Sequence, residues 1–181
     1  MLEHRTAALL AAIALAACGG QARGPGGEKL PAPIANASLF DSSGTRVGLA
    51  TFSEVDGKGR MGVSVSGLSP GQHGMHIHET GACTPPDFES AGSHFNPASK
   101  KHGLLNPEGP HAGDMPNLVV EADGSADTVF TVSAGLLAQG PESMLGPQQR
   151  AFVIHADPDD QKTDPSGNSG SRVVCGVIER R

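Results

Sequence analysis

The fold of this chain is organised by the stretch 76–114, which reads H-I-H-E-T-G-A-C-T-P-P-D-F-E-S-A-G-S-H-F-N-P-A-S-K-K-H-G-L-L-N-P-E-G-P-H-A-G-D. Five of the chain's eight histidines lie in it, and a sixth, His155, ends the apolar run A-F-V-I-H. Positions 79–116 are rich in glycine and proline and show no apolar period. Irregular segments of this length are uncommon in compact domains and are usually functional. Because such a loop forms no core of its own, we expect a metal ion or a disulfide to hold it.

Short runs of alternating apolar and polar residues flank this stretch on both sides. They lie at 34–40, 47–55, 61–68, 74–78, 117–122, 126–132, 151–155 and 173–178. Turn sequences such as D-S-S-G and D-G-K-G separate them. A period of two with turns between the runs is typical of β-strands, so the sequence predicts an all-β sandwich or barrel with long loops.

Composition sets the outer limits. A chain of 181 residues has room for one domain of ordinary size. Its formal net charge of −6 argues against nucleic-acid binding, which usually needs a basic surface. Trp and Tyr are absent and Phe occurs only 6 times, so we expect Val, Leu, Ile and Ala to form the core.

The N-terminal segment has the pattern of an export signal. Residues 1–17 end in an Ala-, Leu- and Ile-rich run that is too short to span a bilayer. The sequence L-A-A-C that closes at Cys18 resembles the lipidation motif of bacterial lipoproteins, although Glu3 is unusual in such a signal; an ordinary secretory signal with a chance cysteine is the alternative. Residues 18–33 have the glycine- and proline-rich composition of a tether, which leaves 34–181 as the folded domain.

The histidines have the spacing of metal ligands. On a strand, His76 and His78 point to the same face and can chelate one ion, although two surface histidines would be the simpler reading of the motif alone. Three imidazoles and one carboxylate follow at His94, His102, His111 and Asp114, a donor set that suits tetrahedral zinc. Together with His155, the H-I-H pair makes a second, nitrogen-rich set that suits copper(II). If His94 is shared, both sets reach four ligands.

Several spaced blocks resemble the copper/zinc superoxide dismutase family, in its bacterial lipoprotein form. They are G-M-H-I-H-E-T-G at 74–81, S-A-G-S-H-F-N-P at 90–97, K-K-H-G at 100–103, H-A-G-D-M-P-N at 111–117 and G-N-S-G-S-R-V-V-C-G-V-I at 167–178. Agreement of several blocks in order is far more specific than a single motif. The resemblance covers about 34–181 and implies an eight-stranded Greek-key barrel.

The resemblance also implies residue roles. Copper would be bound by His76, His78, His94 and His155, and zinc by His94, His102, His111 and Asp114, with one ion of each per chain. Asp159 would accept hydrogen bonds from His76 and His102 and so orient both rings. Arg172 would attract and orient the superoxide anion, and His94 would couple electron to proton transfer. His73 is expected to have a structural role rather than to bind metal.

Two cysteines remain after Cys18. In an exported chain, Cys83 and Cys175 are expected to form a disulfide, with two buried thiols as the alternative. By resemblance this bond ties the long loop to the last strand. The chain departs from the family in its short segment between His155 and Cys175, where the run D-P-S at 164–166 replaces a common lysine.

The predicted activity is the dismutation of superoxide to dioxygen and hydrogen peroxide in the bacterial cell envelope, by a periplasmic, membrane-anchored lipoprotein that is a monomer or a homodimer. An envelope protein that binds copper or zinc without dismutation is the first alternative. A structural β-sandwich whose metals only brace the loop is the second. A missing ligand or a missing Arg172 would favour the first alternative, and none is missing. A site that holds only zinc, with no redox metal, would favour the second.

Overall fold

The structure is a computed structural model that describes residues 31–138, 140 and 143–181. The predicted signal and Cys18 lie outside the described residues. The elements are β1 (Ala35–Asp41), β2 (Arg46–Val55), β3 (Lys58–Val65), β4 (Gly71–His73), β5 (Met75–His78), the 3-10 turn η1 (Glu89–Ala91), β6 (Leu118–Val120), β7 (Ala126–Val132), α1 (Ala134–Leu137), β8 (Ala151–His155), β9 (Arg172–Val177) and β10 (Glu179–Arg180).

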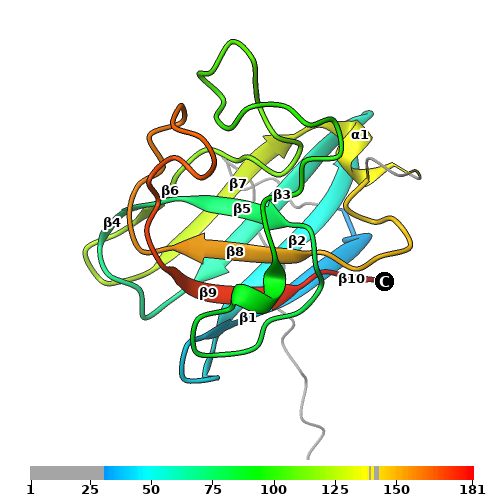
Figure 1. Ribbon diagram of the computed structural model, residues 1–181. Coiled ribbons are helices and arrows are strands. Elements are labelled where there is room, and N and C mark those ends of the chain that lie inside the picture. Colours follow the sequence, from blue (N-terminus) through cyan, green and yellow to red (C-terminus); the bar gives the residue numbers. More distant parts are fainter. Residues whose placement is uncertain (1–30, 139, 141–142) are drawn as a thin grey trace, which may run out of the picture.

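Within the described residues, an eight-stranded antiparallel sheet forms the body of the domain. Its strands follow the order β5-β8-β9-β1-β2-β3-β7, and β10 pairs with β1. The sheet curls round, and a small second sheet of β4 and β6 lies near its open side (Figure 1). The predicted all-β class is confirmed, and each of the eight predicted runs overlaps a strand. The short elements β4, β10, η1 and α1 were not predicted.

The period of two in the sequence becomes the core. On β1, Ala35, Ala37 and Leu39 are fully buried, while the residues between them are partly exposed. The expectation of a purely aliphatic core is wrong, because Phe52 and Phe152 are among the largest fully buried side chains. Three phenylalanines, Phe52, Phe95 and Phe152, and several methionines supply the bulky side chains of the main core.

The strands β5 and β8 are buried on both faces. Side chains alternate along β5: Met75 and Ile77 belong to the main core, whereas His76 and His78 lie on the outer face of the sheet. Residue Val153 is opposite His76 and packs in a separate small cluster with Phe88 beneath the long loop. The loop therefore covers the outer face of β5 and β8 and encloses the histidines. No helix among the described residues has the length and hydropathy to cross a membrane.

Candidate metal centre

The free edge of β5 brings the two distant loop segments to the histidines. The amide of Ile77 donates to Gly113 O at 2.9 Å, and its carbonyl accepts from the amide of Phe95 at 2.8 Å. His94 and Asp114 thereby lie beside His78 and His76 as isolated bridges. At Gly113 a Cβ atom would lie 2.3 Å from the carbonyl oxygen of Ile77, so only glycine allows this approach.

Two clusters of donor atoms result, and each fits within a 4.8 Å limit. The first contains all four residues predicted for copper: His76, His78, His94 and His155. The second contains His76, His94, His102 and Asp114. The predicted zinc ligand His111 is outside this compact group but adjoins it, with its Nδ1 atom 3.3 Å from Oδ1 of Asp114. The structure thus brings the seven predicted ligands together, with His76 and His94 common to both clusters.

Three buried ring nitrogens of the first cluster have no hydrogen-bond partner within the described residues: Nδ1 of His76, Nε2 of His78 and Nε2 of His155. In the second cluster and beside it, Nδ1 of His102 and Nδ1 of His111 face a single oxygen, Oδ1 of Asp114, at 3.0 and 3.3 Å. Buried polar atoms normally have partners, and leaving one unpaired costs about 1–3 kcal/mol. The unpartnered nitrogens of the first cluster, and the imidazole nitrogens gathered around one carboxylate oxygen in the second, fit metal ions as partners.

The opposite ring nitrogens are held in place. Nε2 of His76 donates to Asp159 at 2.8 Å, and Nε2 of His102 donates to the same carboxylate at 3.0 Å. Nδ1 of His78 donates to Gly92 O at 2.9 Å, and Nδ1 of His155 donates to a loop carbonyl at 3.2 Å. Such bonds fix the tautomer and orientation of metal-binding rings.

Asp159 is itself clamped by a residue that the sequence did not single out. The side chain of Asn117 donates to the carbonyl of Asp159 at 2.9 Å and accepts from its amide at 2.9 Å. The amide of Gln161 donates to Oδ1 of Asp159 at 2.6 Å. Asn117 ends the block H-A-G-D-M-P-N, but both of its bonds to Asp159 are with backbone atoms, and backbone partners leave no sequence pattern from which its role could be predicted.

Three histidines of the first cluster, His76, His78 and His155, have lowered pKa values and are neutral at pH 7. Burial lowers the pKa of His76 to about 4 despite the hydrogen bond to Asp159, and burial with neighbouring histidines lowers the pKa of His155 to about 3. Burial also lowers the pKa of His78. Neutral imidazoles are the form that binds metal, so this cluster is ready for an ion at neutral pH.

The second cluster has the opposite electrostatics. Burial opposes charge on His102, but hydrogen bonds with Asp114 and Asp159 outweigh it and raise the pKa of His102 to about 9. For the carboxyl groups of Asp114 and Asp159, burial alone would raise the pKa. Hydrogen bonds from histidine outweigh burial, so the pKa of each group lies well below its usual value. Two ionised carboxylates around one histidine make a site that needs a positive charge, which a divalent ion supplies.

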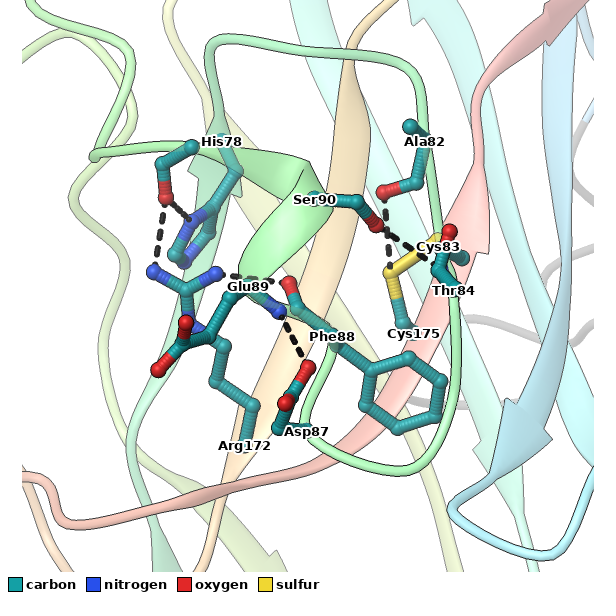
Figure 2. Close-up of a disulfide and its surroundings, with 11 residues drawn as sticks. His78, Ala82, Cys83, Thr84, Asp87, Phe88, Glu89, Ser90, Arg172 and Cys175 are labelled. Atoms are coloured by element: carbon teal, nitrogen blue, oxygen red, sulfur yellow. Dashed lines mark hydrogen bonds between the residues drawn. A yellow bond between two sulfur atoms is a disulfide. The ribbon is translucent and has the colours of Figure 1, made fainter.

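The predicted disulfide between Cys83 and Cys175 is confirmed and joins residues 92 positions apart. It ties the loop to β9 beside η1 (Figure 2). Arg172 begins β9 and donates to Phe88 O at 2.6 Å and to Gly92 O at 2.7 Å. Because Gly92 O also accepts from His78, one carbonyl links Arg172 to the first cluster (Figure 2).

Three histidines of the first cluster line an open depression of about 830 Å³. Its lining includes His78, His94, His155 and Arg172, so a small anion in it reaches the first cluster and the guanidinium together. His73 is buried elsewhere, with Nδ1 2.7 Å from His155 O and Nε2 2.8 Å from Ser69 O, a structural arrangement as expected.

A curled antiparallel sheet that carries two adjoining donor clusters, one of imidazoles and one of imidazoles with a carboxylate, defines a two-metal β-barrel protein. The sequence profile described as "Copper/zinc superoxide dismutase (SODC)" matches residues 46–178. The chain belongs to the copper/zinc superoxide dismutase family, as its motifs predicted.

Relatives and solved structures agree with this assignment. The chain is 44% identical over 146 residues to "Superoxide dismutase [Cu-Zn] 2" of Aquifex aeolicus, covering 80% of this chain and 85% of that protein. It is 46% identical over 143 residues to "Superoxide dismutase-like protein YojM" of Bacillus subtilis, covering 77% and 73%. A crystal structure of a SOD-like protein from Bacillus subtilis matches with a TM-score of 0.74 at 43% identity, covering 78% of this chain and 96% of that chain. The Cu/Zn superoxide dismutase from Brucella abortus matches with a TM-score of 0.63 at 29% identity, covering 80% and 99%.

Proposed function

We propose that this chain is a superoxide dismutase that converts two superoxide anions and two protons into dioxygen and hydrogen peroxide. The observation that carries the proposal is that three buried ring nitrogens of the first cluster have no hydrogen-bond partner and that this cluster adjoins an open depression that also contains Arg172. Membership of the family supports it.

The metal assignments are part of the proposal. His76, His78, His94 and His155 would hold copper, and His94, His102, His111 and Asp114 would hold zinc. When bound, copper supplies one-electron redox chemistry and zinc supplies a fixed positive charge without redox chemistry. Zinc would replace the proton on Nδ1 of His102, which faces Asp114, while Nε2 would keep its proton toward Asp159. The negative charge of Asp114 would therefore favour zinc in the second cluster.

Arg172 binds and orients the substrate. Two of its nitrogens are fixed by carbonyl groups of the loop, so the guanidinium is held in place before an anion arrives. The remaining N–H groups and the positive charge can attract superoxide toward the first cluster. The loop that the disulfide ties down thus becomes part of the binding site.

His94 is placed to handle a proton. Its Nδ1 atom lies 3.2 Å from Oδ1 of Asp114 on the side of the second cluster, and the ring stacks on His76 at 3.8 Å between centroids. With Nδ1 held on that side, Nε2 can accept one proton and give it to the departing peroxide. Water supplies the second proton.

Cell location is the other part of the proposal. A disulfide in a bacterial-type enzyme fits an oxidising compartment outside the cytoplasm. We infer export through the signal at 1–17, lipidation of Cys18 and attachment to a membrane of the cell envelope by the tether 18–33, with 34–181 as the catalytic domain. Mass spectrometry of the N-terminal peptide tests this: a diacylglyceryl group on Cys18 supports the anchor, and an unmodified N-terminus at any other residue removes it.

The dismutase proposal is tested by the decay of superoxide in the presence of the purified protein. We expect fast decay with copper and zinc bound and no acceleration with zinc alone. If the protein binds one copper and one zinc and superoxide still decays at the uncatalysed rate, the chain is a metal-binding protein and the proposal is wrong.

A further inference from the structure

Arg150 is a buried cation beside the first cluster, and it has no part in the proposed chemistry. It directly precedes β8, lines the depression and is only 8% exposed. It forms no ion pair with a carboxylate of residues 31–138, 140 and 143–181, and its buried Nε atom has no hydrogen-bond partner there. Arginine is rarely buried without a paired carboxylate, because removing the charge from water is costly. Its other contacts must therefore account for its place in the fold.

Two contacts of Arg150 reach the chain next to two proposed copper ligands. Nη1 of Arg150 donates to Glu79 O at 2.6 Å, and Glu79 directly follows His78 at the end of β5. The guanidinium carbon lies 4.5 Å from the ring centroid of Phe95, which directly follows His94. One side chain thus joins the segments that carry His78 and His94.

The backbone of Arg150 is itself fixed. Its carbonyl accepts from the amide of Ile178 at 2.9 Å, and Nη1 also donates to Oε1 of Gln148 at 3.2 Å. The strand β8 starts at the next residue and ends at His155, so the same strand carries a third proposed copper ligand. Arg150 therefore connects three of the four segments that would hold copper.

The second cluster depends less on these contacts. Among the proposed zinc ligands, only His94 lies next to a residue that Arg150 contacts. The carboxylate of Asp114 is held separately, because the amides of Gly103 and His111 donate to its Oδ2 atom at 2.8 and 2.9 Å. Loss of the Arg150 contacts should therefore weaken the copper site more than the zinc site.

We propose that Arg150 is a positioning residue for copper, which holds the segments of His78 and His94 together so that both rings face one ion. The inference rests on the copper assignment in the proposed function. Because the charge is buried without a carboxylate partner, we do not expect Arg150 to stabilise the metal-free fold. Its contribution should instead be seen in the geometry of the first cluster.

The test compares Arg150→Met and Arg150→Lys with the control Arg60→Met. Methionine keeps the length of the side chain but removes the charge and the bond to Glu79 O, whereas lysine keeps the charge and one donor. Arg60 is the matched control, because it donates from β3 to Thr131, lies outside the lining of the depression and carries the same charge.

Copper affinity is the main readout. In the zinc-loaded protein we expect it to fall about tenfold for Arg150→Met and about threefold for Arg150→Lys, with Arg60→Met unchanged, as measured by competition with chromophoric chelators. Zinc affinity of the copper-free protein should change by less than about twofold. The direction is informative: a nearby cation repels a divalent ion, so removal of the charge alone would strengthen copper binding. The copper(II) EPR spectrum should change in Arg150→Met and return toward that of wild type in Arg150→Lys.

The metal-free protein provides a readout that separates positioning from stability. We expect Arg150→Met to unfold at a temperature no lower than that of wild type, because an apolar side chain replaces a buried charge. Hydrogen exchange at the amide of Phe95, which donates to Ile77 O at 2.8 Å, should become faster in the same variant as the segment loosens.

The outcomes separate this inference from the dismutase proposal. Unchanged copper affinity in Arg150→Met would overturn the positioning role, and so would equal losses of copper affinity, zinc affinity and metal-free stability. Superoxide decay at the uncatalysed rate with both metals bound to wild type would overturn the dismutase function. In that case a selective loss of copper affinity in Arg150→Met would still support the role of Arg150.

Discussion

At the scale of single residues, the centre depends on atoms that serve two partners. Gly92 O accepts from both His78 and Arg172, and Asp159 accepts from both His76 and His102. Each shared acceptor couples a proposed metal ligand to another part of the site. Changes at these points should affect more than one property at once.

The first prediction concerns Arg172. In Arg172→Ala we expect kcat/KM for superoxide to fall by about tenfold with both metals retained, because the anion loses its fixed cation while all seven ligands remain. In Arg172→Lys, which keeps the charge but not the planar fork, we expect a smaller loss. Pulse radiolysis with metal analysis measures both effects, and full activity of the alanine variant would remove Arg172 from the substrate site.

The second prediction concerns Asp159. In Asp159→Asn we expect the affinity for copper and for zinc to fall together by about 10- to 100-fold, since one carboxylate orients a ring in each cluster. Competition with chromophoric chelators gives both affinities. Asp160→Asn is the control, because Asp160 is exposed and bonds to Lys162, Thr163 and Asn168 rather than to a histidine. Loss of only one metal would contradict the shared role.

At the scale of elements, the strands were predictable from the sequence and the loop was not. The eight alternating runs identify strands because burial on one face of a sheet leaves a period of two. The two strands that hold His76, His78 and His155 were among them. The strands β4 and β10 are only 3 and 2 residues long, too short for any period to show.

The path of the loop 79–116 depends on pairings between distant residues. The segments around His94 and Asp114 add to the edge of β5, and no local pattern encodes this arrangement. The ligands could be named from their spacing and from family resemblance, whereas the carbonyl partners of His78, His155 and Arg172 could not. Backbone acceptors carry no residue type, so only the folded structure identifies them.

The third prediction tests whether pairing with the edge of β5 positions the loop. In Gly113→Ala the new Cβ would lie 2.3 Å from Ile77 O, so the segment must move away from β5 and take Asp114 with it. We expect zinc affinity to fall more than tenfold, as measured by chelator competition. Ala112→Ser, at the exposed preceding position, should leave zinc affinity unchanged. Equal zinc affinity in both variants would show that the edge pairing does not position the ligand.

At the scale of the whole molecule, metal binding and stability are linked through the buried histidines. In the metal-free protein, the pKa of His76 and of His155 is lowered to about 4 and about 3, below the unfolded value of 6.5. The folded state therefore binds fewer protons than the unfolded state between these values, and the stability present above pH 6.5 is lost as pH falls. The pKa of His102 is raised to about 9, so its contribution to stability is lost as pH rises rather than as pH falls. Most of that contribution is still present at pH 7, so it changes little between pH 5 and pH 7.

The fourth prediction follows from this linkage. We expect the metal-free protein to be less stable at pH 5 than at pH 7, by up to about 2 kcal/mol for each histidine whose pKa is lowered. Denaturant unfolding of the chelator-treated protein at the two pH values measures the difference. A metal-free protein that is as stable at pH 5 as at pH 7 would contradict the neutral, buried state assigned to these rings.

We propose that one copper ion and one zinc ion share His94 in a single buried centre. Anomalous diffraction from crystals of the copper- and zinc-loaded protein, collected at both absorption edges, tests it most directly. We expect a copper signal within bonding distance of His76, His78 and His155, a zinc signal within bonding distance of His102, His111 and Asp114, and His94 between them. Zinc in both positions, or a single ion with His94 bound on one side only, would contradict the account.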